Sequence, residues 1–357
     1  MINKYKWLEI LMFLPPIIFL VTINIIVDCA NNFHSEVSKQ IVDSILKEQP
    51  IAATSGNGNE REIKKILIEK IPKSIDCIAV GPSLVMYIGE EAVNAKSFFN
   101  LGVSGADHYD IMGIFGLLEL NNINYKKLIL CIDFPLFSNT AYVRKATRHN
   151  YLMPFNNYMI NILNGNNIDN KPSENYFSKF LNAPFFSISY FNECFKHLLK
   201  HKNLKRIKIV ENNAKEQYYT KEASLFPLES KRNASEEKVL KAARDIKNKP
   251  EQFHEIFNGN IDKDCLNQFI QLIDFLQKQN IEIIFWYHPF SPALWDNTNW
   301  NQYPALKELD TWSRKLAKEK NITTIGSYNP HELDLSNLDF MDSRHLKRNA
   351  IAQHFKF

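Results

Sequence analysis

The sequence lacks the cysteine patterns of a metal centre, a redox site or a disulfide framework. Its five cysteines lie far apart, with no C-x-x-C pair and no spacing typical of metal ligands. Basic residues form no broad cluster either: the net charge is only +4 over 357 residues, and the densest basic stretch, 144–149, is short. Nucleic-acid binding needs a broad basic face, so the composition argues against it. We expect no metal, nucleotide or redox cofactor.

Internal repeats and low-complexity tracts are also missing. Hydrophobic residues make up 45% of the chain and charged residues 23%, which is the profile of a folded globular protein. The length accommodates an anchor plus one large domain or two small ones. Cys77 and Cys131 fall in apolar runs, and we interpret them as small buried side chains.

One long uncharged apolar run lies near the N-terminus, from Ile10 to Val27. It is long enough to cross a bilayer, with Lys4 and Lys6 before it and Asp28 after it. This charge bias predicts a single-pass anchor over residues 1–34, with the globular part outside the cytoplasm. A cleaved signal peptide is the alternative, but the region around Asp28 lacks the small-x-small pattern of a cleavage site.

Residues 35–70 follow as a connector. A polar, helix-prone stretch over 35–47 leads into the loop AATSGNGNE at 52–60, which is rich in small and polar residues. This composition is typical of a spacer between a membrane and a domain.

From residue 71 to 357 short apolar runs alternate with helical periodicity. Such alternation indicates parallel strands joined by helices, so we predict an α/β fold with three layers, α/β/α, around a flavodoxin-like five-stranded sheet whose first strand is central. The predicted strands lie at 75–80, 97–101, 127–133, 281–287 and 322–325, and the predicted helices at 108–120, 265–279 and 303–320.

The pattern breaks down over about 135–261. This stretch is aromatic and basic and has helical fragments such as 190–199. Because it is too long for a loop, we expect an inserted helical cap packed over the strand ends.

Polar residues follow the predicted strands, at the edge where parallel α/β sheets bind ligands. They are Gly81-Pro82-Ser83, Asn100 to Gly105, Asp133, His288, and Asp342-Ser343-Arg344-His345 near the C-terminus.

These residue types suit a serine nucleophile. A serine hydroxyl needs an imidazole to take its proton, and the imidazole needs a carboxylate to fix its tautomer. Asp342 precedes His345 by three residues, so both can lie beside Ser83. Each piece also has a structural interpretation, because Ser83 and Asp342 are both residue types that cap helices.

The same residues resemble the sequence blocks of the SGNH (GDSL-type) hydrolases, in the right order over about residues 75–346. The Gly-x-Ser turn is similar to the first block, with Pro82 where Asp is usual, and Asn100 to Gly105 is similar to the second. Asp342-Ser343-Arg344-His345 matches the last block. The runs NLGVSGADHYDIMG and DSRH resemble, more closely, SGNH-like proteins encoded with cell-surface polysaccharide genes.

The resemblance implies Ser83, His345 and Asp342 as catalytic residues, and Ser83, Gly105 and Asp133 around the oxyanion and substrate. The third block departs from the family, which supplies an Asn side chain where this chain has Asp133. A carboxylate cannot donate a hydrogen bond unless it is protonated. Asn139, six residues further on, is a candidate substitute.

Two functions follow from the resemblance. The first is an esterase or O-acyltransferase, foremost for acetyl groups, that acts on a cell-envelope glycan and meets glycan and acyl donor at the membrane. The second is a catalytically weak SGNH-like domain that serves as a glycan-binding or assembly factor, which the Asp133 departure favours.

Overall fold

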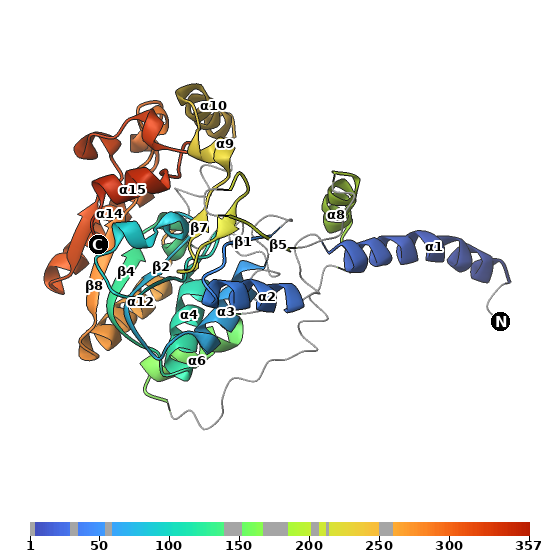
Figure 1. Ribbon diagram of the computed structural model, residues 1–357, viewed down its shortest axis with the longest axis horizontal. Coiled ribbons are helices and arrows are strands. Elements are labelled where there is room, and N and C mark those ends of the chain that lie inside the picture. The colour runs from blue at the N-terminus through green and yellow to red at the C-terminus, as the bar shows by residue number, and fades with distance from the viewer. Residues whose placement is uncertain are drawn as a thin grey trace.

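The computed structural model describes residues 4–28, 35–53, 59–138, 152–166, 185–200, 207–211, 214–249 and 260–357. Its centre is a five-stranded sheet in which every neighbouring pair is parallel (Figure 1). The strand order is β3(Phe98–Asn100), β2(Ser74–Val80), β4(Asn124–Cys131), β8(Glu282–Tyr287) and β9(Thr323–Gly326).

All five strands lie where the sequence predicts them, and the chain is α/β. The prediction that the first strand is central is wrong. β2 pairs with β3 on one side and β4 on the other, and β8 and β9 both add beyond β4. The central strand is therefore β4, and the chain reverses its direction across the sheet between β2 and β4, where ligands of such sheets bind.

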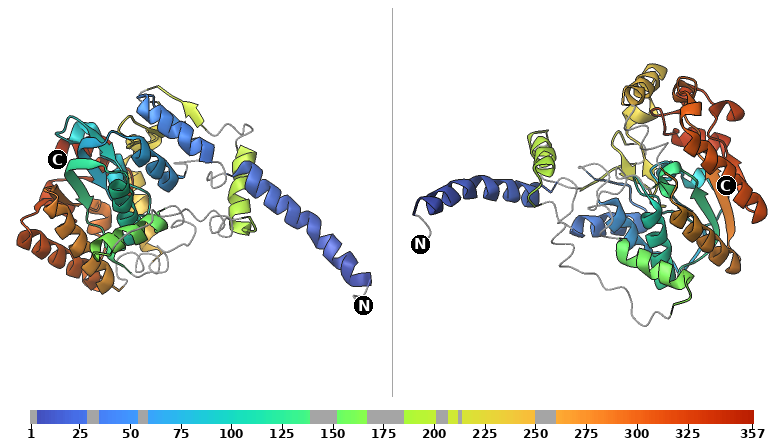
Figure 2. Two further views of the ribbon diagram at one scale, coloured as in Figure 1. Left: turned by 90° about the horizontal axis from the view of Figure 1, so that it is seen from below. Right: turned by 180° about the vertical axis from the view of Figure 1, so that it is seen from behind.

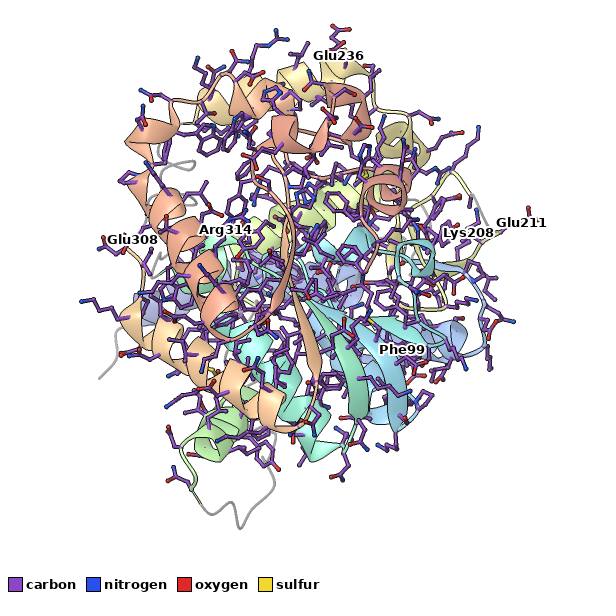
Figure 3. All side chains as sticks on the ribbon, turned by 90° about the vertical axis from the view of Figure 1, so that its left-hand side faces the viewer. Phe99, Lys208, Glu211, Glu236, Glu308 and Arg314 are labelled. Atoms are coloured by element: carbon purple, nitrogen blue, oxygen red, sulfur yellow. The ribbon has the colours of Figure 1, made fainter. Side chains whose placement is uncertain are left out.

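Helices cover both faces of the sheet, as the side chains of β8 show. Phe285 contacts Phe269 of α12(Lys263–Lys278), and the Tyr287 hydroxyl donates to Ser313 of α14(Pro304–Glu319). The intervening Trp286 faces the other way and packs against Phe355, which follows α15(Arg348–His354). Alternate residues of a strand point to opposite faces, so these contacts define the three layers. Figure 3 shows the side chains that fill them, with Arg314 labelled on α14.

The connector is not a spacer. It forms α2(Ser35–Leu46), β1(Ile51–Ala53) and α3(Glu60–Lys70), and the apolar side chains of both helices belong to the main hydrophobic core. Ile41 and Ile45 of α2 and Ile63 and Leu67 of α3 are at most 1% exposed. The two residues of each pair are four positions apart and so lie on the same helix face. The mainly polar composition of the connector hides this apolar face in the sequence.

The inserted region is mixed rather than helical. Its described parts contain α6(Met153–Leu163), α8(Ile188–Lys200), α9(Glu229–Arg232) and α10(Glu236–Lys247). They also contain β5(Ile207–Ile209), β6(Tyr218–Tyr219) and β7(Leu225–Phe226), which form an antiparallel sheet with β1 in the order β5-β1-β6-β7. Strands this short carry little alternation, so the sequence does not reveal them.

Within the insertion, α6 lies against α4(His108–Leu120), which connects β3 to β4. The two backbones approach closely at Gly116, where an added Cβ would lie 2.0 Å from the carbonyl oxygen of Phe155. This part of the insertion therefore packs on a crossover helix.

The N-terminal apolar run forms α1(Lys4–Val27), which extends away from the globular part with α8 beside its C-terminal end (Figures 1 and 2). Tyr190 of α8 donates a hydrogen bond of 2.6 Å to the carboxylate of Asp28. Among the residues described, no helix is both long and apolar enough to count as a membrane span.

Candidate functional site

Ser83 lies at the carboxyl end of β2, on a tight turn that only glycine permits. Gly81 has a φ of +156°, and a Cβ there would lie 2.6 Å from Cγ2 of Val85 and 2.9 Å from Cβ of Cys131. The turn continues into η1(Val85–Tyr87). The carbonyls of Pro82 and Ser83 accept from the backbone N–H groups of Val85 and Met86. Ser83 is left partly exposed at the sheet edge.

His345 and Asp342 meet this serine. The Oγ of Ser83 lies 2.9 Å from Nε2 of His345, although 262 residues separate the two in sequence. On the other side of the ring, Nδ1 of His345 lies 3.0 Å from both carboxylate oxygens of Asp342. The structure therefore brings together the three residues that the sequence predicts to converge.

The carboxylate determines the state of the imidazole. Asp342 can only accept, so Nδ1 of His345 carries the proton and Nε2 of the neutral ring is left to accept from the Ser83 hydroxyl. Burial alone would raise the pKa of Asp342. The His345 ring, which is positively charged when protonated, and the hydrogen bonds from this ring and from the backbone N–H groups of Arg344 and His345 outweigh burial, so the pKa of Asp342 lies well below its ordinary value. Asp342 is thus ionised near neutral pH.

Neighbouring groups hold the segment 342–345 in place. The backbone N–H of Met341 donates to the carbonyl of His345 at 2.8 Å, which closes the turn. The ring of Tyr87 meets the His345 ring edge-on at 5.8 Å between centroids.

His288 is fully buried behind the turn. Its Nδ1 donates to the carbonyl of Pro289, and the backbone N–H of Leu346 lies 3.5 Å from its Nε2. Burial, then the nearby charges of His345 and Arg344, lower the pKa of His288 well below its ordinary value. His288 is therefore a neutral support for the backbone beside His345.

The loop after β3 carries Gly105, the expected second oxyanion donor. Gly105 has a φ of +58°, the left-handed region that favours glycine. The loop is fixed by Asn100, a fully buried side chain whose Nδ2 donates to the carbonyls of Val85 and Ile88 and whose Oδ1 accepts from Gly102. The convergence of the Ser83 and Gly105 N–H groups on one oxyanion stays a prediction.

Residues of α3 fix the same loop from outside the sheet. The carboxylate of Glu60 accepts from the backbone N–H and the hydroxyl of Ser104, at 2.5 and 2.9 Å. Arg61 donates to the carbonyl of Ser104 and forms a buried ion pair with Asp110 at 2.5 Å. The sequence gives no signal for these residues, because residues 35–70 have the polar composition of a spacer.

Asp133, at the third block, forms an ion pair with Arg344. Nη2 of Arg344 lies 3.2 and 3.4 Å from the two carboxylate oxygens, and Oδ1 also accepts from the backbone N–H of Phe134. Asp133 is only 4% exposed. A carboxylate in this pair accepts hydrogen bonds and does not supply the donor that an Asn would. Asn139 lies outside the described residues.

Comparison with known proteins adds no assignment to this geometry: no protein-family model matches the chain, and no curated protein matches it. Within the described part, no group of three or more His, Cys, Asp or Glu side chains is placed to hold a metal ion. Chemically, the arrangement is a hydroxyl with a base and an orienting carboxylate, which suits attack on an acyl carbonyl.

Proposed function

We propose that the chain is an esterase or acyltransferase that acts on acyl groups, foremost O-acetyl groups, of a cell-envelope glycan. One observation carries the proposal: Ser83, His345 and Asp342 form a hydrogen-bonded series with distances of 2.9 and 3.0 Å. A series of this kind at the carboxyl edge of a parallel sheet is the geometry that nucleophilic serine catalysis requires.

The first half of the reaction forms an acyl-enzyme. Ser83 Oγ attacks the acyl carbonyl while Nε2 of His345 takes the hydroxyl proton, and Asp342 stabilises the resulting imidazolium. The tetrahedral intermediate then expels the sugar oxygen, which receives the proton from His345. The backbone N–H groups of Ser83 and Gly105 are the proposed oxyanion donors.

The second half releases the acyl group. Water or a second sugar hydroxyl attacks the acyl-Ser83 ester, and its proton passes through His345 back to the serine oxygen. Water gives hydrolysis, and a sugar hydroxyl gives transfer. A site that meets glycan and acyl donor at a membrane favours transfer, so the proposal includes an N-terminal anchor and an extracytoplasmic site, supported by the charge bias around the apolar run.

The test uses the purified full chain in detergent, with p-nitrophenyl acetate and then an acetylated oligosaccharide as substrates. We expect release of p-nitrophenol and of acetate. With an unacetylated oligosaccharide as acceptor, transfer produces an acetylated product that mass spectrometry detects. Absence of both release and transfer by folded protein contradicts the proposal.

The ion pair of Asp133 and Arg344 favours a second candidate, a glycan-binding or assembly factor with weak or no catalysis. The pair occupies the place of an oxyanion-donating amide and leaves the backbone N–H groups as donors there. This candidate predicts glycan binding without turnover in the same assay.

A further inference from the structure

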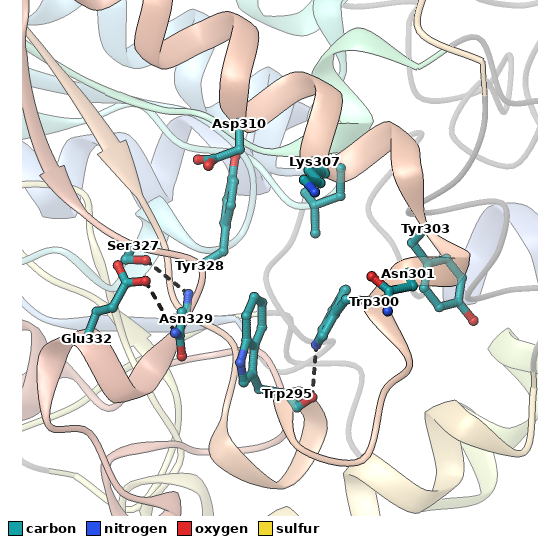
Figure 4. A pocket seen from close by; sticks show the side chains of 11 residues that line it. Trp295, Trp300, Asn301, Tyr303, Lys307, Asp310, Ser327, Tyr328, Asn329 and Glu332 are labelled. Atoms are coloured by element: carbon teal, nitrogen blue, oxygen red, sulfur yellow. Dashed lines mark hydrogen bonds between the residues drawn. The ribbon is translucent and has the colours of Figure 1, made fainter.

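A second concave site lies on the same edge of the sheet, beyond β8 and β9 (Figure 4). Its volume is about 220 Å³. The walls come from the segment after β8, the first turns of α14 and the segment after β9. Pockets for drug-sized ligands usually have ~300–1,000 Å³, so this one suits a smaller, single-ring group.

One wall of the pocket is aromatic and is lined by Trp295, Trp300 and Tyr303. Trp295 and Trp300 lie 4.8 Å apart between centroids, and Phe290 stacks on Trp300 at 4.9 Å. The indole N–H of Trp300 donates to the carbonyl of Trp295 at 2.9 Å, which fixes the pair. Tyr303 meets Trp300 edge-on. Trp295 and Trp300 both line the pocket and are partly exposed, so this wall offers apolar aromatic surface to a ligand.

Much of the remaining lining is polar, and several of its side chains are held by hydrogen bonds or ion pairs. Asn329 donates to the carboxylate of Glu332 at 3.3 Å, and its side-chain oxygen accepts from the backbone N–H of His331. Asp310, on α14, is paired with Arg314 at 2.8 Å. The charge of Asp310 is therefore compensated by Arg314, whereas Glu332 is held by a neutral amide. Lys307 adds a cation to the lining, so the pocket offers both hydrogen-bonding and charged groups.

We propose that this pocket binds a sugar ring of a glycan. A pyranose has an apolar face of C–H groups and a rim of hydroxyls. The C–H face buries against the indole surface, and the hydroxyls pair with the amide and carboxylate groups across the pocket. A quaternary ammonium ligand fits less well, because it needs aromatic faces on several sides. Trp295, Trp300 and Phe290 instead stack on one another, with interplanar angles of 16° to 30°.

The pocket is linked to the candidate active site. The backbone N–H of Ser291, four residues before Trp295, donates to the carbonyl of Ser343, which follows Asp342 directly. Both sites lie at the carboxyl ends of parallel strands and therefore at the same edge of the sheet. The inference deepens the proposed function and rests on it for its role in acyl chemistry, whereas sugar binding itself does not require Ser83.

The experiment uses the full-length Ser83→Ala protein, which binds without turnover. Methyl glucoside, methyl galactoside, N-acetylglucosamine and N-acetylgalactosamine are each titrated. Saturation-transfer NMR and tryptophan fluorescence follow binding. We expect ring C–H protons of at least one sugar to receive saturation. Trp295→Leu should weaken that binding at least about tenfold, a loss of ~1.4 kcal/mol.

Two further variants keep the test decisive. Asn329→Ala should weaken binding without touching the indoles, even if Trp295→Leu fails to fold. Lys315→Ala is the control, because Lys315 lies on α14 outside the pocket and is 73% exposed, and it should bind like the parent.

Three results overturn the inference: no sugar binds, or binding survives both pocket variants, or choline binds and the sugars do not. If the sugar binds but the wild-type chain shows no acyl chemistry, the proposed function is contradicted and this inference is supported. If the wild-type chain shows acyl chemistry but no sugar binds, this inference is contradicted and the proposed function is supported.

Discussion

Arg344 forms an ion pair with Asp133, with Nη2 3.2 Å from Oδ2, and thereby links the segment that carries the candidate base to the end of the central strand. Arg344 lies between Asp342 and His345, while Asp133 lies two residues after Cys131, the last residue of β4. The guanidinium compensates the negative charge of Asp133, and the proposed acyl chemistry would develop a second negative charge at the same edge of the sheet. The ion pair therefore helps to position His345 and also neutralises the charge of Asp133.

Arg344→Ala should lower kcat/KM about 10²-fold, the loss typical of one oxyanion donor, because Asp133 then presents an uncompensated carboxylate. Arg344→Ala combined with Asp133→Asn should recover at least about tenfold of that loss, since the amide is neutral and can donate. Steady-state kinetics with p-nitrophenyl acetate measure both.

Breaking a buried ion pair lowers the free energy of unfolding by ~3–5 kcal/mol. Thermal unfolding of each variant therefore shows whether activity is lost through the changed charge or through loss of folded protein. A double variant that is no faster than Arg344→Ala, at equal folded fraction, argues against the charge effect.

Asp342→Asn should lower kcat by about 10⁴-fold and still leave more activity than Ser83→Ala, because the carboxylate orients the imidazole and does not itself react. An Asn amide can donate to Nδ1 and so favours the wrong tautomer. Asp339→Asn is the control, since Asp339 caps a nearby exposed turn. Equal activity of Asp342→Asn and wild type would exclude a role for this carboxylate.

Asn100→Ala should destabilise the chain by about 3 kcal/mol, because it leaves buried backbone groups of Val85, Ile88 and Gly102 without their partner. Activity should fall too, since Asn100 ties the loop of Gly105 to the turn after Ser83. Chemical denaturation measures the effect. Asn124→Ala, an exposed residue at the opposite end of the sheet, should change stability by less than ~0.5 kcal/mol. Similar values for both variants contradict the prediction.

Lys64 should give the chain a stability that rises with pH above neutrality. Burial lowers its pKa to about 7, against the partial opposing effect of Glu60 and Glu222, and its Nζ donates to the carbonyls of Asn100 and Ala223. Unfolded lysine titrates at ~10.4, so between about pH 7 and pH 10 the unfolded state binds more protons than the folded state.

Urea unfolding at several pH values tests this. Relative to Lys64→Met, wild type should gain up to ~1.4 kcal/mol per pH unit above pH 7 and show no change in the difference below it. Lys70→Met is the control, because Lys70 is partly exposed and pairs with Asp43 at the surface. Parallel curves for wild type and Lys64→Met above pH 7 contradict the assignment.

The sequence was sufficient to predict the positions of the five strands and the convergence of three residues, for physical reasons. β2 and β4 are buried at their carboxyl halves and read as continuous apolar runs. The carboxyl ends of parallel strands lie at one edge of the sheet. Ser83, which follows β2, is therefore expected near the residues that follow the other strands. The family resemblance added His345 and Asp342.

Other features were not predictable from local patterns. The centre of the sheet depends on long-range pairing, and nothing near β2 encodes that β8 and β9 add beyond β4. Glu60, Arg61 and Lys64 look like surface charges of a polar helix, although each is at most 8% exposed. The partner of Asp133 lies 211 residues away. These buried charges and their partners come together only in the folded chain, so no local sequence pattern identifies them.

The central claim is that Ser83 is an activated nucleophile, and labelling with a fluorophosphonate probe tests it most directly. The full-length wild-type chain should take up one probe, and mass spectrometry should locate it on the peptide that contains Ser83. Ser83→Ala should remain unlabelled with an unchanged melting temperature, whereas Ser230→Ala, at an exposed serine far along the chain, should label like wild type. Folded wild-type protein that takes up no probe, or a Ser83→Ala variant that is still labelled, would contradict the account.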